Sequence, residues 1–232
     1  PTPRLSLTYF HERDVRSDDP FTDAIEPSIP YSLAVMVHNT GFGEAREVRI
    51  ISSQPQIIEN EKGLLIDFDL IANEIAGAPV LPTLTADFGS LPPGGIKVGR
   101  WLFQSSLQGQ FIEYSAAFEN IGPLKDFPEL STIDRVSIHE LIHLVRAEGP
   151  DFPDDGVPDF LVNDRADDDF LPDTLYLSDG STNQVSVVLG ATVDGVPTDT
   201  DLEVELTANA PSGWVYRRLP DPANGRYRLV RV

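Results

Sequence analysis

Apolar and polar residues alternate over short stretches along most of the chain. The segment 32–38 places Leu33, Val35 and Val37 on one face, which is the period-two pattern of a half-buried strand. The same pattern predicts strands at 48–50, 63–70, 84–88, 96–104, 111–118, 174–177, 184–189, 202–206, 214–219 and 226–232. Turn-forming residues separate many of these segments, as at 91–95, Asp194-Gly195 and Asn224-Gly225. Short strands at near-regular spacing predict an all-β protein built as an antiparallel sandwich.

Residues 30–120 carry two turn motifs in a fixed order. A strand ends in Asn39-Thr-Gly41-Phe-Gly43, a second strand follows over Ala45-Arg-Glu-Val48, and Phe88-Gly-Ser-Leu-Pro-Pro-Gly94 precedes a later strand. We expect Gly41 and Gly43 to allow a tight turn with positive φ, and Asn39 to bond its own backbone. This arrangement resembles the Ig-like repeats of bacterial and archaeal surface proteins, of which the CARDB cell-adhesion-related domain is the nearest example. The resemblance implies a spacer or adhesion role and supplies no catalytic residues, and an insertion over 56–82 separates the two motifs.

The domain organisation follows from a change in composition. We predict an Ig-like sandwich over 1–146, an Asp- and Pro-rich linker over 147–173 and a second small β domain over 174–232. The last segment alternates like a strand and then stops, so we interpret the chain as a fragment of a longer protein.

Charge narrows the classes of partner. The formal net charge is -20, and only three of the 17 basic residues are lysines, at Lys62, Lys97 and Lys125. Nucleic acid and anionic lipid need clustered basic residues, which this chain lacks. An acidic surface suits a salty or calcium-containing medium, which favours an extracellular or cell-surface location, although a GC-rich genome gives the same bias. Cysteine is absent, and no stretch has the roughly 18 consecutive apolar residues of a membrane helix.

One motif points to zinc chemistry. His139-Glu140-Leu-Ile-His143 matches the H-E-x-x-H pattern of zinc proteases, in which a helix holds both imidazoles on one face and the glutamate is the general base. A helical stripe and a strand both fit the apolar positions around it. The surrounding β-branched residues favour a strand, and no third ligand is evident in the sequence. A zinc peptidase is therefore kept only as an alternative to a non-catalytic function.

An Asp-rich segment points to calcium instead. Asp154-Asp-Gly-Val-Pro-Asp159 resembles half of the calcium repeats of thrombospondin-type surface modules, and Ca²⁺ takes six to eight oxygen ligands. The candidate ligands are Asp155, Asp159, Asn163, Asp164, Asp167 and Asp169. The competing interpretation is a solvated acidic linker.

The sequence as a whole predicts a non-catalytic structural or adhesion module, with calcium as its candidate cofactor. Its expected partners are other domains of the parent chain, other surface proteins or glycans. A second alternative is a carbohydrate-binding sandwich, for which Trp101 and the pair Trp214 and Tyr216 are the candidate aromatic residues.

Overall fold

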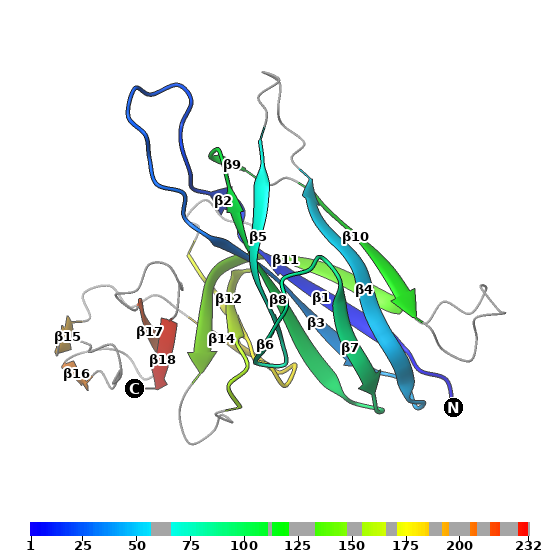
Figure 1. Cartoon of the computed structure of the whole chain (residues 1–232). Coiled ribbons are helices and arrows are strands. Elements are labelled where there is room, and N and C mark those ends of the chain that lie inside the picture. The colour runs from blue at the N-terminus through cyan, green and yellow to red at the C-terminus, as the bar shows by residue number, and fades with distance from the viewer. Residues whose placement is uncertain are drawn as a thin grey trace. The chain divides into compact units, whose positions relative to one another are not determined.

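The fold is all-β. The computed structural model describes residues 1–56, 66–110, 113–120, 133–147, 155–165, 171–185, 192–194, 205–207, 214–218 and 227–231. Within these ranges every regular element is a strand, so the all-β prediction is confirmed (Figure 1). In the same ranges, no helix is long and apolar enough to cross a membrane. The chain divides into two compact units, Pro1–His139 and Glu140–Val232.

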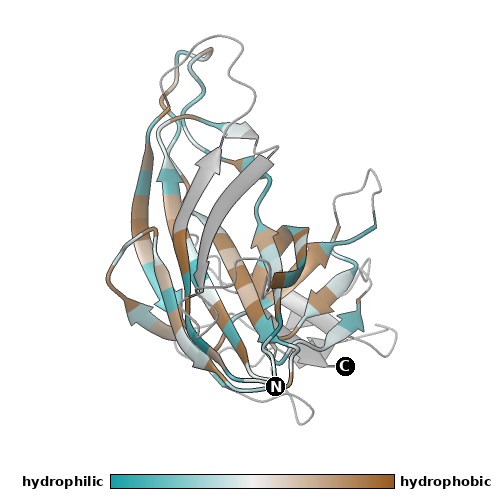
Figure 2. Ribbon diagram, turned by 90° about the vertical axis from the view of Figure 1, so that its right-hand side faces the viewer, coloured by the Kyte–Doolittle hydropathy of each residue, from teal (hydrophilic) through white to brown (hydrophobic). Residues whose placement is uncertain are grey.

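The larger sheet of the first unit has the order β11-β1-β3-β8-β5-β6. Its strands are β1 (Leu5–His11), β3 (Tyr31–Asn39), β5 (Phe68–Ile75), β6 (Ala78–Val80), β8 (Ile96–Ser105) and the first part of β11 (Ile133–Ala147). β3 pairs antiparallel with β1 and with β8 along most of its length, and β5 continues the sheet beyond β8. The hydropathy bands in Figure 2 alternate along many of these strands, as the period-two pattern predicts.

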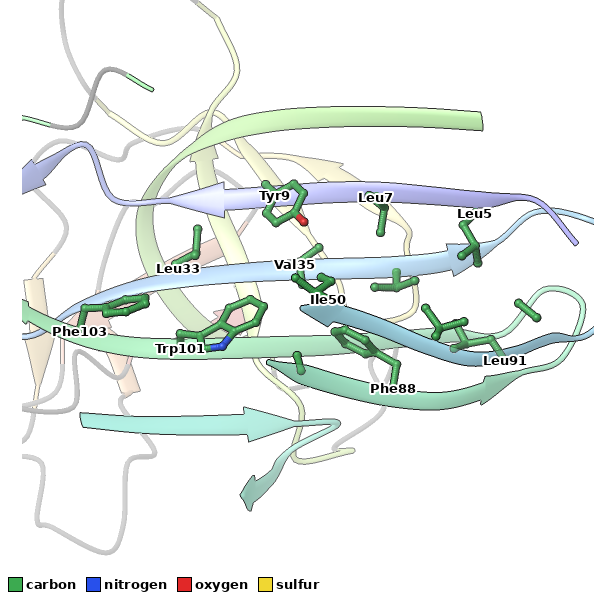
Figure 3. Close-up of a cluster of buried hydrophobic side chains, with 14 of the residues drawn as sticks. Leu5, Leu7, Tyr9, Leu33, Val35, Ile50, Phe88, Leu91, Trp101 and Phe103 are labelled. Atoms are coloured by element: carbon green, nitrogen blue, oxygen red, sulfur yellow. The ribbon is translucent and has the colours of Figure 1, made fainter. Parts of the chain in front are cut away.

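A second sheet packs against one face of the first. It has the order β10-β4-β7, formed by β4 (Ala45–Gln56), β7 (Ala86–Leu91) and β10 (Glu113–Asn120). A short pair, β2 (Asp14–Val15) with β9 (Gly109–Gln110), stands apart from both sheets. The core between the sheets contains residues from both, including Leu7, Leu33, Val35, Ile50, Phe88, Leu91, Trp101 and Phe103 (Figure 3). The first unit is therefore a sandwich with an apolar core between its two sheets.

β1 and β11 run parallel to each other. The two strands are neighbours in the sheet, and two side-chain contacts fix their relation. Ser137 Oγ donates to Thr8 Oγ1 at 3.4 Å, and the ring of His139 stacks on Phe10 with centroids 5.8 Å apart. Both contacts join residues that differ by the same number of positions, and a constant offset is the register of a parallel pair. The first and last strands of this unit thus lie side by side and point the same way.

The buried side chain of Asn39 closes one end of the sandwich. Its Nδ2 donates to the carbonyls of Gly43 at 2.7 Å and Leu91 at 3.0 Å. Its Oδ1 accepts from the backbone N–H of Gly41 at 3.1 Å and of Arg4 at 3.3 Å. One amide therefore joins the N-terminal segment to both turn motifs that the sequence analysis singled out.

The turn after Asn39 uses its glycines for close approach. The expected local bond from Asn39 to its own backbone is present, whereas the expected positive φ at Gly41 and Gly43 was wrong. A Cβ on Gly41 would collide with the backbone of Arg4, and one on Gly43 would collide with the carbonyl of Pro1. The glycines are needed because the N-terminal segment lies directly against them.

The second unit is built on a smaller sheet. The end of β11 pairs antiparallel with β12 (Asp159–Asn163), which continues to β13 (Thr174–Tyr176) and β14 (Thr182–Gln184). β18 (Tyr227–Arg231) joins β11 in parallel and pairs with β17 (Trp214–Arg218), and β15 (Thr192–Asp194) pairs with β16 (Glu205–Thr207). Val145, Ala147, Leu161, Leu175 and Leu177 form its apolar core.

Two segments of the sequence analysis, one of which it predicted incorrectly, contain strands of the structure. The span 147–173 was expected to be a linker, but Asp159–Asn163 is a strand whose Phe160, Leu161 and Val162 are fully buried. The insertion at 56–82 contains β5 and β6, which belong to the large sheet. Parts of both spans, and Asn224-Gly225, lie outside the described residues.

We predict that Asn39→Ala lowers the free energy of unfolding by about 2–4 kcal/mol, because it removes four hydrogen bonds and leaves buried backbone groups without partners. Urea denaturation followed by Trp fluorescence measures this change. The neighbouring exposed variant Thr40→Ala is the control and should change the value by less than about 0.5 kcal/mol. Equal midpoints for the two variants would contradict this role of Asn39.

Candidate functional site

The H-E-x-x-H motif lies on a strand. His139, Glu140 and His143 all belong to β11, so the strand interpretation is confirmed. The strand carries a register shift between Leu141 and His143 and remains extended on both sides of it. Four residues of extended chain span about 13 Å, whereas two ligands of one zinc ion each lie about 2 Å from the metal. The local backbone therefore does not form the two-histidine arrangement of a zinc peptidase.

The calcium candidates are only partly brought together. Asp167 and Asp169 lie outside the described residues, and Asp155, Asp159, Asn163 and Asp164 lie within them. Within the described part of the chain, no group of three or more His, Asp or Glu side chains is arranged to hold a metal ion. The prediction of calcium binding is therefore neither supported nor contradicted.

The side chain of Asp159 is buried and accepts hydrogen bonds from two backbone N–H groups. Its Oδ2 accepts from the N–H of Ala147 at 2.7 Å, and its Oδ1 accepts from the N–H of Ser178 at 2.8 Å. Burial raises the pKa of this carboxyl to about 6, although the two hydrogen bonds lower it. The nearby carboxylates of Asp155 and Asp179 also raise the pKa. Both oxygens are thus engaged in joining β12 to its neighbouring segments.

Asp155 and Asp164 also bond within the protein. Asp155 accepts from Ser178 Oγ at 2.7 Å and from the N–H of Val157 at 2.8 Å. Asp164 Oδ2 accepts from the hydroxyl of Tyr176 at 2.8 Å. Asn163 is half-buried, and its Oδ1 has no hydrogen-bond partner among the described residues.

Asp173 is an anchor that the sequence analysis did not single out. Its carboxylate accepts from the N–H groups of Asp164 at 3.1 Å and Arg165 at 2.7 Å, and from Thr174 Oγ1 at 2.7 Å. Burial acts to raise the pKa of Asp173, but these hydrogen bonds and the charge of Arg165 outweigh it, so the pKa lies below its usual value. Any Asp in this acidic segment fits such a role equally well in sequence, so only the fold selects it.

A second carboxyl group with a raised pKa, that of the half-buried Glu12, lies in the first unit. Glu12 Oε1 accepts from the N–H of Ser32 at 3.0 Å. Burial raises the pKa of Glu12 to about 7, against this hydrogen bond and the positive charges of Arg100 and Arg16. Arg100 also lies 3.9 Å from Glu74 Oε2, so the group is a small internal charge network. A perturbed carboxyl is a common mark of a catalytic site, but this one bonds to the strand backbone.

The structure describes the side chain of one of the three candidate sugar-binding aromatic residues, Trp101. Trp101 is buried in the sandwich core, and its Nε1 donates to the carbonyl of Thr83 at 3.1 Å. A ring enclosed on both faces offers no stacking surface to a sugar. Trp214 and Tyr216 lie on β17, where the structure describes the strand pairing alone.

Comparison with known proteins adds no relative. No protein-family model, curated protein or solved structure matches the chain. What the molecule itself defines is its class, an all-β protein whose first unit is a sandwich. The likeness to CARDB-type repeats stays a prediction.

We predict that the stability of the second unit falls as the pH rises from about 4 to about 6. The pKa of Asp159 is raised in the folded state, so the folded protein binds more protons than the unfolded chain in this window. The stabilisation is complete below the unfolded-state pKa and is lost as the pH rises through the folded-state value, a change on the order of 3 kcal/mol.

Urea denaturation of wild type and Asp159→Asn across this range measures the effect, because the amide does not titrate. The free energy of unfolding of wild type minus that of Asp159→Asn should fall as the pH rises from about 4 to about 7. Asp173→Asn is the control, because the pKa of Asp173 is lowered, so its contribution to stability changes with pH in the opposite direction to that of Asp159. A constant gap between wild type and Asp159→Asn would contradict the role of Asp159.

Proposed function

We propose that this chain is a non-catalytic, force-resisting structural module of an extracellular or cell-surface protein. The observation that supports this most strongly is the parallel pairing of β1 with β11 in the first unit. The first of these strands follows the N-terminus of the unit, and the second leads out of it. A pull on the two ends of this unit therefore acts along the strands in opposite directions.

The direction of loading decides how a strand pair resists force. Strands pulled along their length slide only if many ladder hydrogen bonds break together, whereas strands pulled apart from one end lose their bonds one at a time. β1 has strand neighbours on both sides, and its seven residues are all in register with β3. Removing β1 also exposes Leu5, Leu7 and Tyr9 from the core.

Two further properties fit a surface module. The net charge of -20 keeps an extended multidomain protein hydrated and disfavours association with other acidic surfaces. The absence of cysteine means that the sandwich depends on its core and on buried hydrogen bonds, such as those of Asn39, for its integrity.

We predict that the force that unfolds the first unit depends on the pulling axis. Because the native chain has no cysteine, pairs of introduced cysteines define the axis for single-molecule pulling. Thr2→Cys with Ile138→Cys loads β1 and the first part of β11 along their length, because Ile138 lies near the end of the part of β11 that belongs to the first unit. Thr2→Cys with Asp134→Cys pulls the same strands apart from one end. The first pair should unfold at the higher force, although both variants should have the same urea midpoint. Equal forces would remove the mechanical proposal.

Calcium binding by the acidic segment is a separate proposal, on which the mechanical role does not depend. If Ca²⁺ binds the folded state and not the unfolded chain, millimolar CaCl₂ should raise the midpoint of thermal unfolding relative to EDTA. Metal analysis of protein purified without chelator should then find calcium. Asp167→Asn with Asp169→Asn should reduce or abolish the shift, because this variant removes two of the six candidate oxygen ligands. Identical midpoints in calcium and EDTA would exclude a stabilising calcium site.

A further inference from the structure

The outer edge of the first part of β11 is a candidate docking strand. β1 lies on one side of this part, whereas the pairing of β11 with β12 begins only at Glu140. Among the residues that the structure describes, no strand pairs with the other edge of Asp134–Ile138. The edge of a strand presents a row of backbone N–H and C=O groups that a further strand can pair with.

Apolar side chains accompany this edge. Ser137 and His139 face Thr8 and Phe10, so strand alternation places Val136 and Ile138 on the opposite face. Val136 is 49% exposed and Ile138 is 52% exposed. Single exposed apolar residues are common, but two on one face of a strand beside an open edge form a small apolar strip.

The other exposed edge of the same sheet has a different design. β6 also exposes an apolar residue, Val80, but Pro79 lies in the middle of this strand and carries no N–H. A proline in an edge strand interrupts the ladder that a further strand would form. The segment 133–139 contains no proline, so its backbone retains every donor.

We propose that Asp134–Ile138 binds an extended, positively charged segment of a partner protein by strand addition. An extended chain is the ligand that satisfies a ladder edge and places alternate side chains on Val136 and Ile138. The strand itself is neutral, since it carries Asp134 and Arg135, but the chain as a whole has a formal charge of -20. That overall charge attracts a positively charged segment and repels a second copy of this chain. This inference goes beyond the mechanical role, and neither one requires the other.

The test uses a short fluorescent peptide of alternating Val and Lys, with binding followed by anisotropy. Val136→Ser with Ile138→Ser should weaken binding roughly five- to tenfold, because two cross-strand apolar contacts are lost without a change of charge. Val80→Ser is the matched control, an exposed Val on the edge strand that carries the proline, and should leave binding unchanged. A peptide in which Pro replaces each Val should not bind, since it lacks half of the ladder donors.

Hydrogen exchange separates strand addition from simple charge attraction. Binding of the Val-Lys peptide should slow amide exchange within 134–138, and unchanged exchange there would overturn the proposal. Equal affinity of the double Ser variant and wild type would do the same. Sedimentation of the protein without peptide should show a monomer. An oligomer that disappears in the double Ser variant would show that a second copy of this chain, rather than a partner, occupies the edge. The pulling experiment gives the same result in either case, so the two proposals fail independently.

Discussion

The buried amide of Asn39 is the interaction on which the end of the sandwich depends. A buried side-chain amide is costly unless its donors and acceptor are satisfied, and Asn39 satisfies them with backbone groups from separate segments. Its position therefore fixes where the N-terminal segment begins β1 and where the turn after Leu91 leads into β8. The glycines beside it carry no side chain because the N-terminal backbone occupies that space. The hydrogen bonds of this one side chain thus join the N-terminal segment and both turn motifs at one end of the unit.

The anchoring of β1 connects the fold to the proposed function. β1 is held at its start by the bond from Arg4 to Asn39, along its length by β3, and on its other side by β11. Its inward residues belong to the core between the two sheets, so the strand cannot leave without opening that core. A strand with these restraints suits a protein whose task is to keep its shape. Among the strands that the structure describes, none pairs with the other edge of Asp134–Ile138, and this is where we propose that a partner strand binds.

The acidic residues illustrate how one residue type serves different roles. Asp159 and Asp173 look alike in the sequence, yet burial sets the raised pKa of the first, whereas the hydrogen bonds and the charge of Arg165 together outweigh burial and lower the pKa of the second. Both accept backbone N–H groups, so they hold segments of the second unit together whether or not calcium binds nearby. Spacing of carboxylates in the sequence does not distinguish a metal ligand from such an anchor, because only the folded chain brings the N–H groups to them.

The sequence by itself determined the all-β class and several strands of the first unit, such as β3 with its buried residues. Period-two alternation is a local property, so it correctly placed Leu33, Val35 and Val37 on one buried face of a strand. Leu5, Leu7 and Tyr9 of β1 alternate in the same way, but the sequence analysis did not predict that strand. The β-branched surroundings of His139 likewise predicted a strand at the H-E-x-x-H motif. Tertiary structure alone decided that β1 lies between β3 and β11 and that β12 is a buried strand within the acidic segment. It also decided that the carboxyls of Glu12 and Asp159 have raised pKa values. These features depend on contacts between residues far apart in the chain, and a local pattern carries no information about which distant segment covers it.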